Sequence, residues 1–113
     1  MSPSWNDWLR RLRHDLVKRL LWPARDRRDM GGEVRPGELV VALVDEEGQA
    51  TTAEALWASL CQDAPAPAHP ALAAFTAALL SAADAARRDD IAGVLALEAA
   101  FARLAQQLAE EKI

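Results

Sequence analysis

Only three side chains in this sequence carry an imidazole or a thiol, and they lie far apart: His14, Cys61 and His69. A zinc site needs several such ligands at short spacings, and a nucleophilic cysteine needs a base beside it. We interpret His14 as an exposed charge partner, Cys61 as a small buried apolar side chain and His69 as a solvated linker residue. The sequence therefore predicts no metal site and no catalytic nucleophile.

Clustered carboxylates are the next group that could do chemistry, at Asp89-Asp90, at Glu110-Glu111 and in the run 45–47. Acid–base catalysis requires two carboxyl groups held at a set separation in a cleft. Helix caps and turns explain these clusters more simply. The sequence also has no phosphate-binding glycine motif and no nucleophile elbow, and Gly31-Gly32 reads only as a turn. We predict no catalytic residues, no cofactor and no enzymatic activity.

A basic, aromatic segment at residues 5–22 is the most distinctive feature of the chain. It contains three of the four tryptophans and five basic residues. Its apolar residues recur every three or four positions and fall within about 120° of helical arc; they are Trp5, Trp8, Leu9, Leu12, Leu16 and Leu20. Ser4 with Asp7 predicts a capped helix start, whereas Pro23 predicts that the helix ends or kinks at Trp22.

Residues 24–32 read as a charged connector, and residues 39–44 are an apolar run rich in valine. That run suits a buried strand, although a short helix capped by Gly48 fits the same letters. We prefer the strand, because the acids at 45–47 would oppose the dipole at a helix C-terminus. Its partner would be residues 49–51 in a small hairpin, or a strand of another chain.

The rest of the chain predicts helices. Thr51 with Glu54 forms a capping box for a short helix through Cys61, and the proline-rich residues 64–70 form an extended connector. Two longer helices follow, from about Pro70 to Arg88 and from a cap at Asp89 or Asp90. Their apolar seams alternate spacings of three and four, which predicts an antiparallel αα-hairpin. The seams are Leu72, Phe75, Leu79, Ala82 and Ala86, then Val94, Leu97, Phe101, Leu104 and Leu108.

These elements predict a mainly α fold: a small helical domain with a C-terminal antiparallel αα-hairpin and one short strand or hairpin near 39–51. With 113 residues and 51% hydrophobic composition, the chain is one domain by length. Its parts are residues 1–32 (basic helix and connector), 33–63 (strand or turn plus helix), 64–70 (connector) and 71–113 (helical hairpin).

Residues 70–83 contain no charged side chain. A helix that is apolar all round is usually covered on more than one side. The second cover would be the N-terminal helices of the same chain. The alternative is a partner protein or a second copy, the latter giving a homodimer through the C-terminal helices.

Charge is unevenly distributed along the chain. The net charge is −4, but residues 1–36 carry +4 and residues 37–113 carry −8. This asymmetry indicates either a segment that meets an anionic partner or two halves that neutralise each other within one fold. Tryptophan with arginine is typical of interface anchors. The predicted partner-binding residues are Trp5, Trp8, Arg10, Arg11, Arg13, Lys18, Trp22, Arg25, Arg27 and Arg28.

The leading hypothesis is a non-enzymatic accessory protein, such as a subunit, assembly factor or regulator, that binds a larger protein complex. A peripheral membrane adaptor acting through the N-terminal helix is one alternative. A nucleic-acid-binding regulator is the other, which the acidic body disfavours. We expect no signal peptide and no stretch approaching the roughly 18 apolar residues of a membrane span, hence a cytoplasmic location. The alanine and arginine usage is typical of a bacterial genome.

Whether the N-terminal helix is free or docked on the body decides which of its residues reach a partner. The uncovered helix over residues 70–83 favours docking. Residues 5–20 would then pack inward, and the basic edge with residues 25–28 would stay outside.

Overall fold

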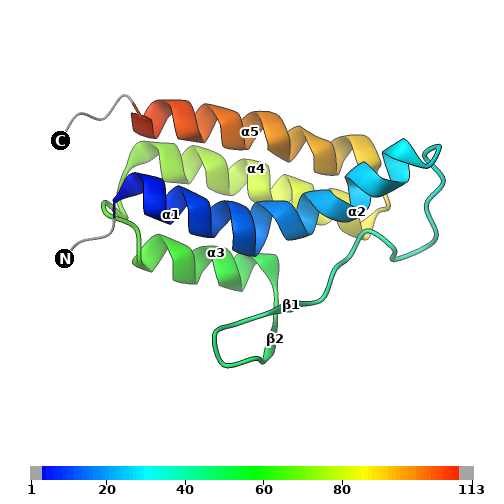
Figure 1. Cartoon of the computed structure of the whole chain (residues 1–113), viewed down its shortest axis with the longest axis horizontal. Helices are drawn as coiled ribbons and strands as arrows, with labels where there is room; N and C mark the ends of the chain where they lie inside the picture. Colours follow the sequence, from blue (N-terminus) through cyan, green and yellow to red (C-terminus); the bar gives the residue numbers. More distant parts are fainter. Residues whose placement is uncertain (1–3, 110–113) are drawn as a thin grey trace.

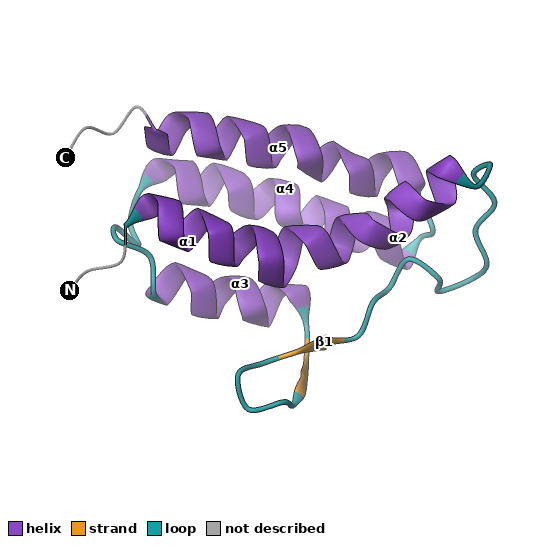
Figure 2. Cartoon of the chain, viewed as in Figure 1, coloured by secondary structure: helices purple, strands orange, loops and turns teal. Residues whose placement is uncertain are grey.

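The structure, a computed structural model, describes residues 4–109. Its helices lie side by side in an elongated bundle, with the start of α1 and the end of α5 at the same end of the bundle (Figure 1). A small hairpin projects from one side of the helices (Figure 2). The predicted mainly helical fold and its C-terminal helical hairpin are confirmed.

A single unbroken helical run forms the N-terminal part of the bundle. It comprises α1 (Trp5–Leu12), the π-helical turn η1 (Arg13–Val17) and α2 (Lys18–Asp29). Ser4 caps it as predicted, since the Asp7 amide donates to Ser4 Oγ at 3.2 Å. Of the two outcomes predicted at Trp22, the helix end is wrong, because the helix continues through Pro23 to Asp29. The predicted connector at 24–32 is therefore helical as far as Asp29.

Packing against α5 explains how the helix passes the proline. α2 contacts α5 more extensively than any other helix outside its own run, and Leu20, Leu21 and Ala24 are all buried beside Pro23. Pro23 removes one backbone hydrogen bond. Burial of the flanking apolar side chains outweighs that loss, because tertiary packing supplies most of the stability of a helix in a protein.

The π-helical turn aligns the core positions of this long helix. Within it, the Lys18 amide donates to the Arg13 carbonyl, five residues back. Four core residues, Trp8, Leu12, Leu16 and Leu20, follow one another at steps of four, and each step overshoots an α-helical turn by about 40°. The wider π turn absorbs part of the overshoot. As a result all four side chains are at most 4% exposed.

The predicted hairpin is present. β1 (Leu43–Val44) pairs antiparallel with β2 (Ala50–Thr51), with Leu43 opposite Thr51. The preferred strand and its pairing with residues 49–51 are confirmed, and the short helix is excluded. The strand is shorter than 39–44 and is not buried throughout, because only one side of this segment meets the bundle: Leu39 and Leu43 are buried, but Val40 is 52% exposed.

α3 (Ala53–Gln62) begins one residue later than predicted. The cap is Thr52 rather than Thr51, since the Ala55 amide donates to Thr52 Oγ1 at 3.1 Å. Thr51 and Thr52 each carry a hydroxyl that could cap the helix. Because Thr51 is paired in β2, Thr52 takes the cap position. On its apolar face Ala53, Trp57 and Leu60 are buried.

The C-terminal hairpin consists of α4 (Pro70–Arg87) and α5 (Ile91–Ala109). All five predicted seam residues of α4 are buried, as are those of α5 except Phe101, which is half-buried. Asp90 caps α5, because the Gly93 amide donates to its Oδ1 at 3.1 Å. α3, α5 and α2 all pack against α4, so the second cover predicted for it comes from the same chain.

α5 differs from one sequence expectation. The mean hydropathy of Ile91–Ala109 is 1.2, so by length and composition alone this helix could cross a membrane, whereas no such stretch is expected from the apolar runs in the sequence. The difference arises because the many alanines raise the mean hydropathy, although Glu98 and Arg103 interrupt the run of apolar residues. Its Val94, Leu97, Leu104 and Leu108 are core residues of the bundle.

Candidate functional site

The imidazole and thiol groups stay separate in the folded chain. Within residues 4–109 no group of three or more His, Cys, Asp or Glu side chains is placed to hold a metal ion. Cys61 is half-buried on α3, and burial raises the pKa of its thiol. A raised pKa keeps the thiol protonated at neutral pH, which makes it a poor nucleophile.

His69 is not the solvated linker residue that the sequence predicts. It is half-buried and caps α4, with Nδ1 accepting from the Ala71 amide at 3.0 Å. Its ring meets the indole of Trp5 edge-on, with 5.8 Å between the centroids. The connector folds back onto the N-terminal helix, which places this imidazole in a packed position that local sequence cannot reveal.

Several aspartates of the carboxylate clusters accept hydrogen bonds from backbone amides. Asp89 Oδ1 accepts from the Gly37 amide at 3.0 Å, and Asp90 caps α5. In the hairpin turn, Asp45 Oδ1 accepts from the amides of Glu47 and Gln49, both at 2.9 Å. The pair Glu110-Glu111 lies outside the described residues. Asp90 and Asp45 thus act as a cap and in a turn, in line with their interpretation from sequence, whereas Asp89 binds a loop distant in the chain.

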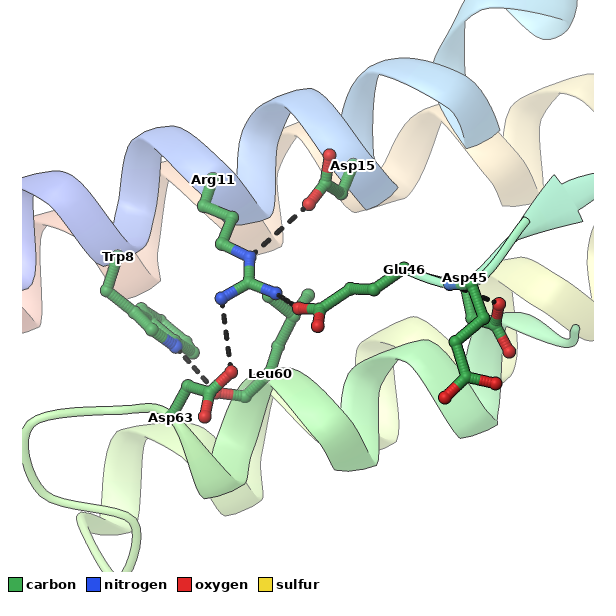
Figure 3. A network of polar contacts seen from close by, with 8 residues as sticks. Trp8, Arg11, Asp15, Asp45, Glu46, Leu60 and Asp63 are labelled. Carbon is green, nitrogen blue, oxygen red and sulfur yellow. Dashed lines mark hydrogen bonds and ion pairs between the residues drawn. The ribbon is translucent and has the colours of Figure 1, made fainter. Parts of the chain in front are cut away.

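Arg11 is the centre of a polar network that ties three elements together (Figure 3). Its guanidinium contacts Asp15 at 3.5 Å, Asp63 at 3.1 Å and also Glu46. Burial on its own lowers the pKa of Arg11, but the hydrogen bonds and charges of Glu46 and Asp63 outweigh it and raise that pKa above its usual value. Arg11 therefore joins α1 to the hairpin turn and to the end of α3, and its charge is already neutralised.

Trp5 and Trp8, which the sequence places among the partner-binding residues, belong to the core. They are 8% and 2% exposed. The Trp8 indole donates to the Leu60 carbonyl at 2.7 Å (Figure 3), and its ring lies 5.5 Å from Trp5 and 5.9 Å from Trp57. Their assignment to a partner surface is corrected, because the apolar face of the helix is used to close the bundle.

Trp22 has the opposite environment. It is 65% exposed, although the other three tryptophans are buried. Beside it runs a groove of about 400 Å³ along the outer side of the N-terminal helix. We call this the Trp22 surface; its lining residues are Arg10, Arg13, His14, Val17, Lys18, Leu21, Trp22 and Arg25.

The basic residues of this region differ in their partners. Arg25 pairs with Glu98 of α5 at 2.6 Å, Arg27 with Glu38, and Arg28 with its neighbour Asp29 at 3.4 Å. In the N-terminal helix, four cations have no carboxylate of residues 4–109 within ion-pairing distance; they are Arg10, Arg13, Lys18 and Arg19. The uncompensated positive charge therefore lies along η1 and the adjoining turns, rather than at 25–28.

A second, smaller hollow adjoins the other side of Trp22. It measures about 260 Å³ and is lined by His14, Lys18, Arg19, Trp22 and Val41. His14, Arg19 and Val41 are not among the partner-binding residues predicted from the sequence. The spacing of three and four from Arg10 to Arg25 would have included His14, but no sequence signal brings Val41 to the helix.

No protein family, curated protein sequence or solved structure that was compared matches this chain. The chemistry of its own surface is therefore the ground for assigning a function.

Proposed function

We propose that this chain is a non-enzymatic accessory protein that binds a larger protein assembly through the Trp22 surface. One observation carries the proposal: Trp22 is 65% exposed beside cations that have no intramolecular partner in the described chain. Tryptophan and arginine are the residues most often found as energetic anchors of protein interfaces. An exposed indole in water also costs free energy that a partner would recover.

The inward packing of the helix favours a protein partner over a membrane. An amphipathic helix enters the lipid interface with its apolar face, but here that face, with Leu12 and Leu16 fully covered, closes the core. Binding lipid by that face would require the bundle to open. For nucleic acid, the −8 carried by residues 37–113 opposes approach of a large polyanion.

Point substitutions test the proposal, since deleting the N-terminal helix would remove core residues and unfold the bundle. Tagged full-length chain would be incubated with extract of its native cells, and captured proteins identified by mass spectrometry. We expect a defined set of proteins to be captured by the native chain and by Met30→Ala, which alters another exposed apolar residue, 72% exposed. Trp22→Ala should lose that set. Equal capture by both variants would contradict the proposal.

The same variants decide between the alternatives. Co-sedimentation with vesicles of phosphatidylcholine and phosphatidylserine at low salt tests the membrane reading, and mobility shift with duplex DNA or RNA tests the nucleic-acid reading. The proposal predicts that neither binds the chain in a Trp22-dependent manner. If vesicles or nucleic acid bind the chain in a Trp22-dependent manner and no protein is captured, a membrane or nucleic-acid partner would replace the proposed protein partner.

A further inference from the structure

The Trp22 surface is a regular stripe along one helix. Five of its charged and aromatic members follow at intervals of three or four residues, namely Arg10, His14, Lys18, Trp22 and Arg25, and Arg13 is next to His14 in sequence. At about 1.5 Å per residue the stripe is about 22 Å long. Val17 and Leu21, both nearly fully buried, lie beneath it. A binding element that uses the whole stripe must therefore be elongated and at least four helical turns long.

The charge of the stripe selects an acidic element. Arg10, Arg13 and Lys18 have no carboxylate partner in the described chain. Each would gain a partner from a carboxylate placed above it. A single slender element that lies on the stripe contacts these cations and avoids the acidic residues of the rest of the chain. A wide polyanion would also have to cover those acidic residues, which repel it.

The repeat distance of the stripe selects a helix over an extended segment. Side chains on one face of a helix recur about every 5.4 Å, whereas those on one face of a strand recur about every 6.7 Å. Over four turns the mismatch with a strand grows to about 5 Å, a full helical turn. Only a helix keeps its carboxylates in register with the cations from Arg10 to Arg25.

Trp22 supplies the apolar contact that fixes the position of such a helix. The hollow of about 260 Å³ between Trp22 and Val41 is lined mainly by apolar surface and lies next to Lys18. A leucine or methionine on the acidic face would fill it while neighbouring carboxylates meet Lys18 and Arg19. Helices commonly dock through one or two apolar anchors spaced at i and i+4 or i+7.

We infer that the partner element recognised by the Trp22 surface is an acidic amphipathic helix, laid along α1, η1 and α2 with one apolar side chain in the hollow beside Trp22. This inference rests on the proposed function and names the chemistry of the partner.

Synthetic peptides test it against the full-length chain. The probe is an 18-residue peptide of alanine and glutamine with glutamates on one helical face at spacings of three and four, and with one central leucine on that face. A second peptide of the same charge carries proline in place of two central alanines, which prevents the helix. A 16-nucleotide oligothymidylate is the nucleic-acid probe. Binding would be followed by fluorescence anisotropy at low salt.

We expect the helical peptide to bind, with the proline peptide at least about tenfold weaker. Lys18→Glu should lower the affinity of the chain for the helical peptide by about tenfold. Arg103→Glu on α5, which makes the same charge change outside the Trp22 surface, should change its affinity by less than about twofold.

Equal binding of the two peptides would overturn the helical partner and leave the proposed function intact, because an acidic protein surface would still be recognised. Absence of binding by either peptide would overturn the inference, and the capture experiment would then decide the proposed function on its own. Tight, steeply salt-dependent binding of the oligonucleotide alone would overturn both.

Discussion

Gly93 on α5 lies so close to Ala85 on α4 that a Cβ built on the glycine would stand 2.6 Å from the Ala85 Cβ. It would also stand 2.7 Å from Oδ2 of Asp90, the carboxylate that caps α5. Glycine is therefore needed here for the close approach of two helices, and not for its backbone freedom.

Replacing this glycine should destabilise the protein. Gly→Ala inside a helix normally stabilises by about 0.5–1 kcal/mol, but we expect Gly93→Ala to lower the free energy of unfolding by about 1–3 kcal/mol through overpacking. Urea denaturation followed by circular dichroism measures the change. Ser81→Ala, on the exposed side of α4, is the control and should shift stability by less than about 0.5 kcal/mol. A more stable Gly93→Ala protein would show that α4 and α5 are less tightly packed.

The Trp8 indole should be replaceable only at a cost. Trp8→Phe removes one of two donors to the buried Leu60 carbonyl, which then accepts only from the Asp63 amide at 3.2 Å. We expect the lost hydrogen bond to lower the free energy of unfolding by about 0.5–1.5 kcal/mol. Trp22→Phe makes the same change at an exposed position and should cost less than about 0.5 kcal/mol. If the two variants unfold at the same urea concentration, Trp8 is not a core residue.

Tryptophan fluorescence gives a direct measure of the exposed indole. Trp5, Trp8 and Trp57 are each at most 8% exposed, while Trp22 is 65% exposed. We expect acrylamide to quench mainly Trp22, so that Trp22→Phe removes most of the quenchable emission and shifts the remainder to shorter wavelength. Trp5→Phe should leave the quenchable fraction in place. Unchanged quenching in Trp22→Phe would mean that another indole is exposed.

Stability should depend on Glu54 in a pH-dependent manner. The hydrogen bond from Arg87 Nη2 to Glu54 Oε1, 2.8 Å long, holds the pKa of this carboxyl below its ordinary value. A carboxyl whose pKa is depressed by folding stabilises the protein above its unfolded pKa and loses that contribution as pH falls through the folded pKa. We expect Glu54→Gln to be less stable than the native chain at pH 7.

That difference should shrink as the pH is lowered through the acidic range, measured by thermal unfolding at a series of pH values. Glu47→Gln, at an exposed position in the hairpin turn, should show no such trend. A difference between native and Glu54→Gln proteins that grows toward acid pH would have the wrong sign for this pair.

The Arg11 network should govern the hairpin more than the whole fold. Its three ion pairs are partly exposed, with 39% of the Arg11 side chain accessible, so we expect Arg11→Met to lower global stability by less than about 1 kcal/mol. Amide hydrogen exchange should nevertheless speed up at Asp45, whose amide donates to the Gln49 carbonyl at 2.9 Å. Arg28→Met, with only a neighbouring partner, is the control. Unchanged exchange at Asp45 would contradict this role.

Local sequence patterns predict much of this fold. The Ser4 cap, the seams of α4 and α5 and the cap at Asp90 each depend on residues within a few positions of one another, and the sequence predicts them. The helix through Pro23 could not be predicted this way, because the packing that sustains it comes from α5, far along the chain. The role of His69 has the same origin, since Trp5 is sixty-four residues away in sequence.

The candidate site shows the same division. The sequence identifies the basic residues as a group, but their neutralisation depends on distant partners: Glu46 for Arg11, Glu98 for Arg25 and Glu38 for Arg27. It also groups Trp5, Trp8 and Trp22 in one segment. Only the accumulated rotation along the helix separates the two core indoles from the exposed one, and helical periodicity alone does not include the π turn that sets this rotation.

The five residues of η1 thus determine more than core alignment. Because their hydrogen bonds span one residue more than those of an α-helix, the same residues wound as a continuous α-helix would rotate α2 by about one residue's angle, roughly 100°, relative to α1. Such a rewinding would carry Trp22 away from Arg10 and Arg13 without changing a single side chain of the Trp22 surface. The angular phase between the two halves of one helix, set by the backbone hydrogen-bonding pattern, is then itself a determinant of binding specificity.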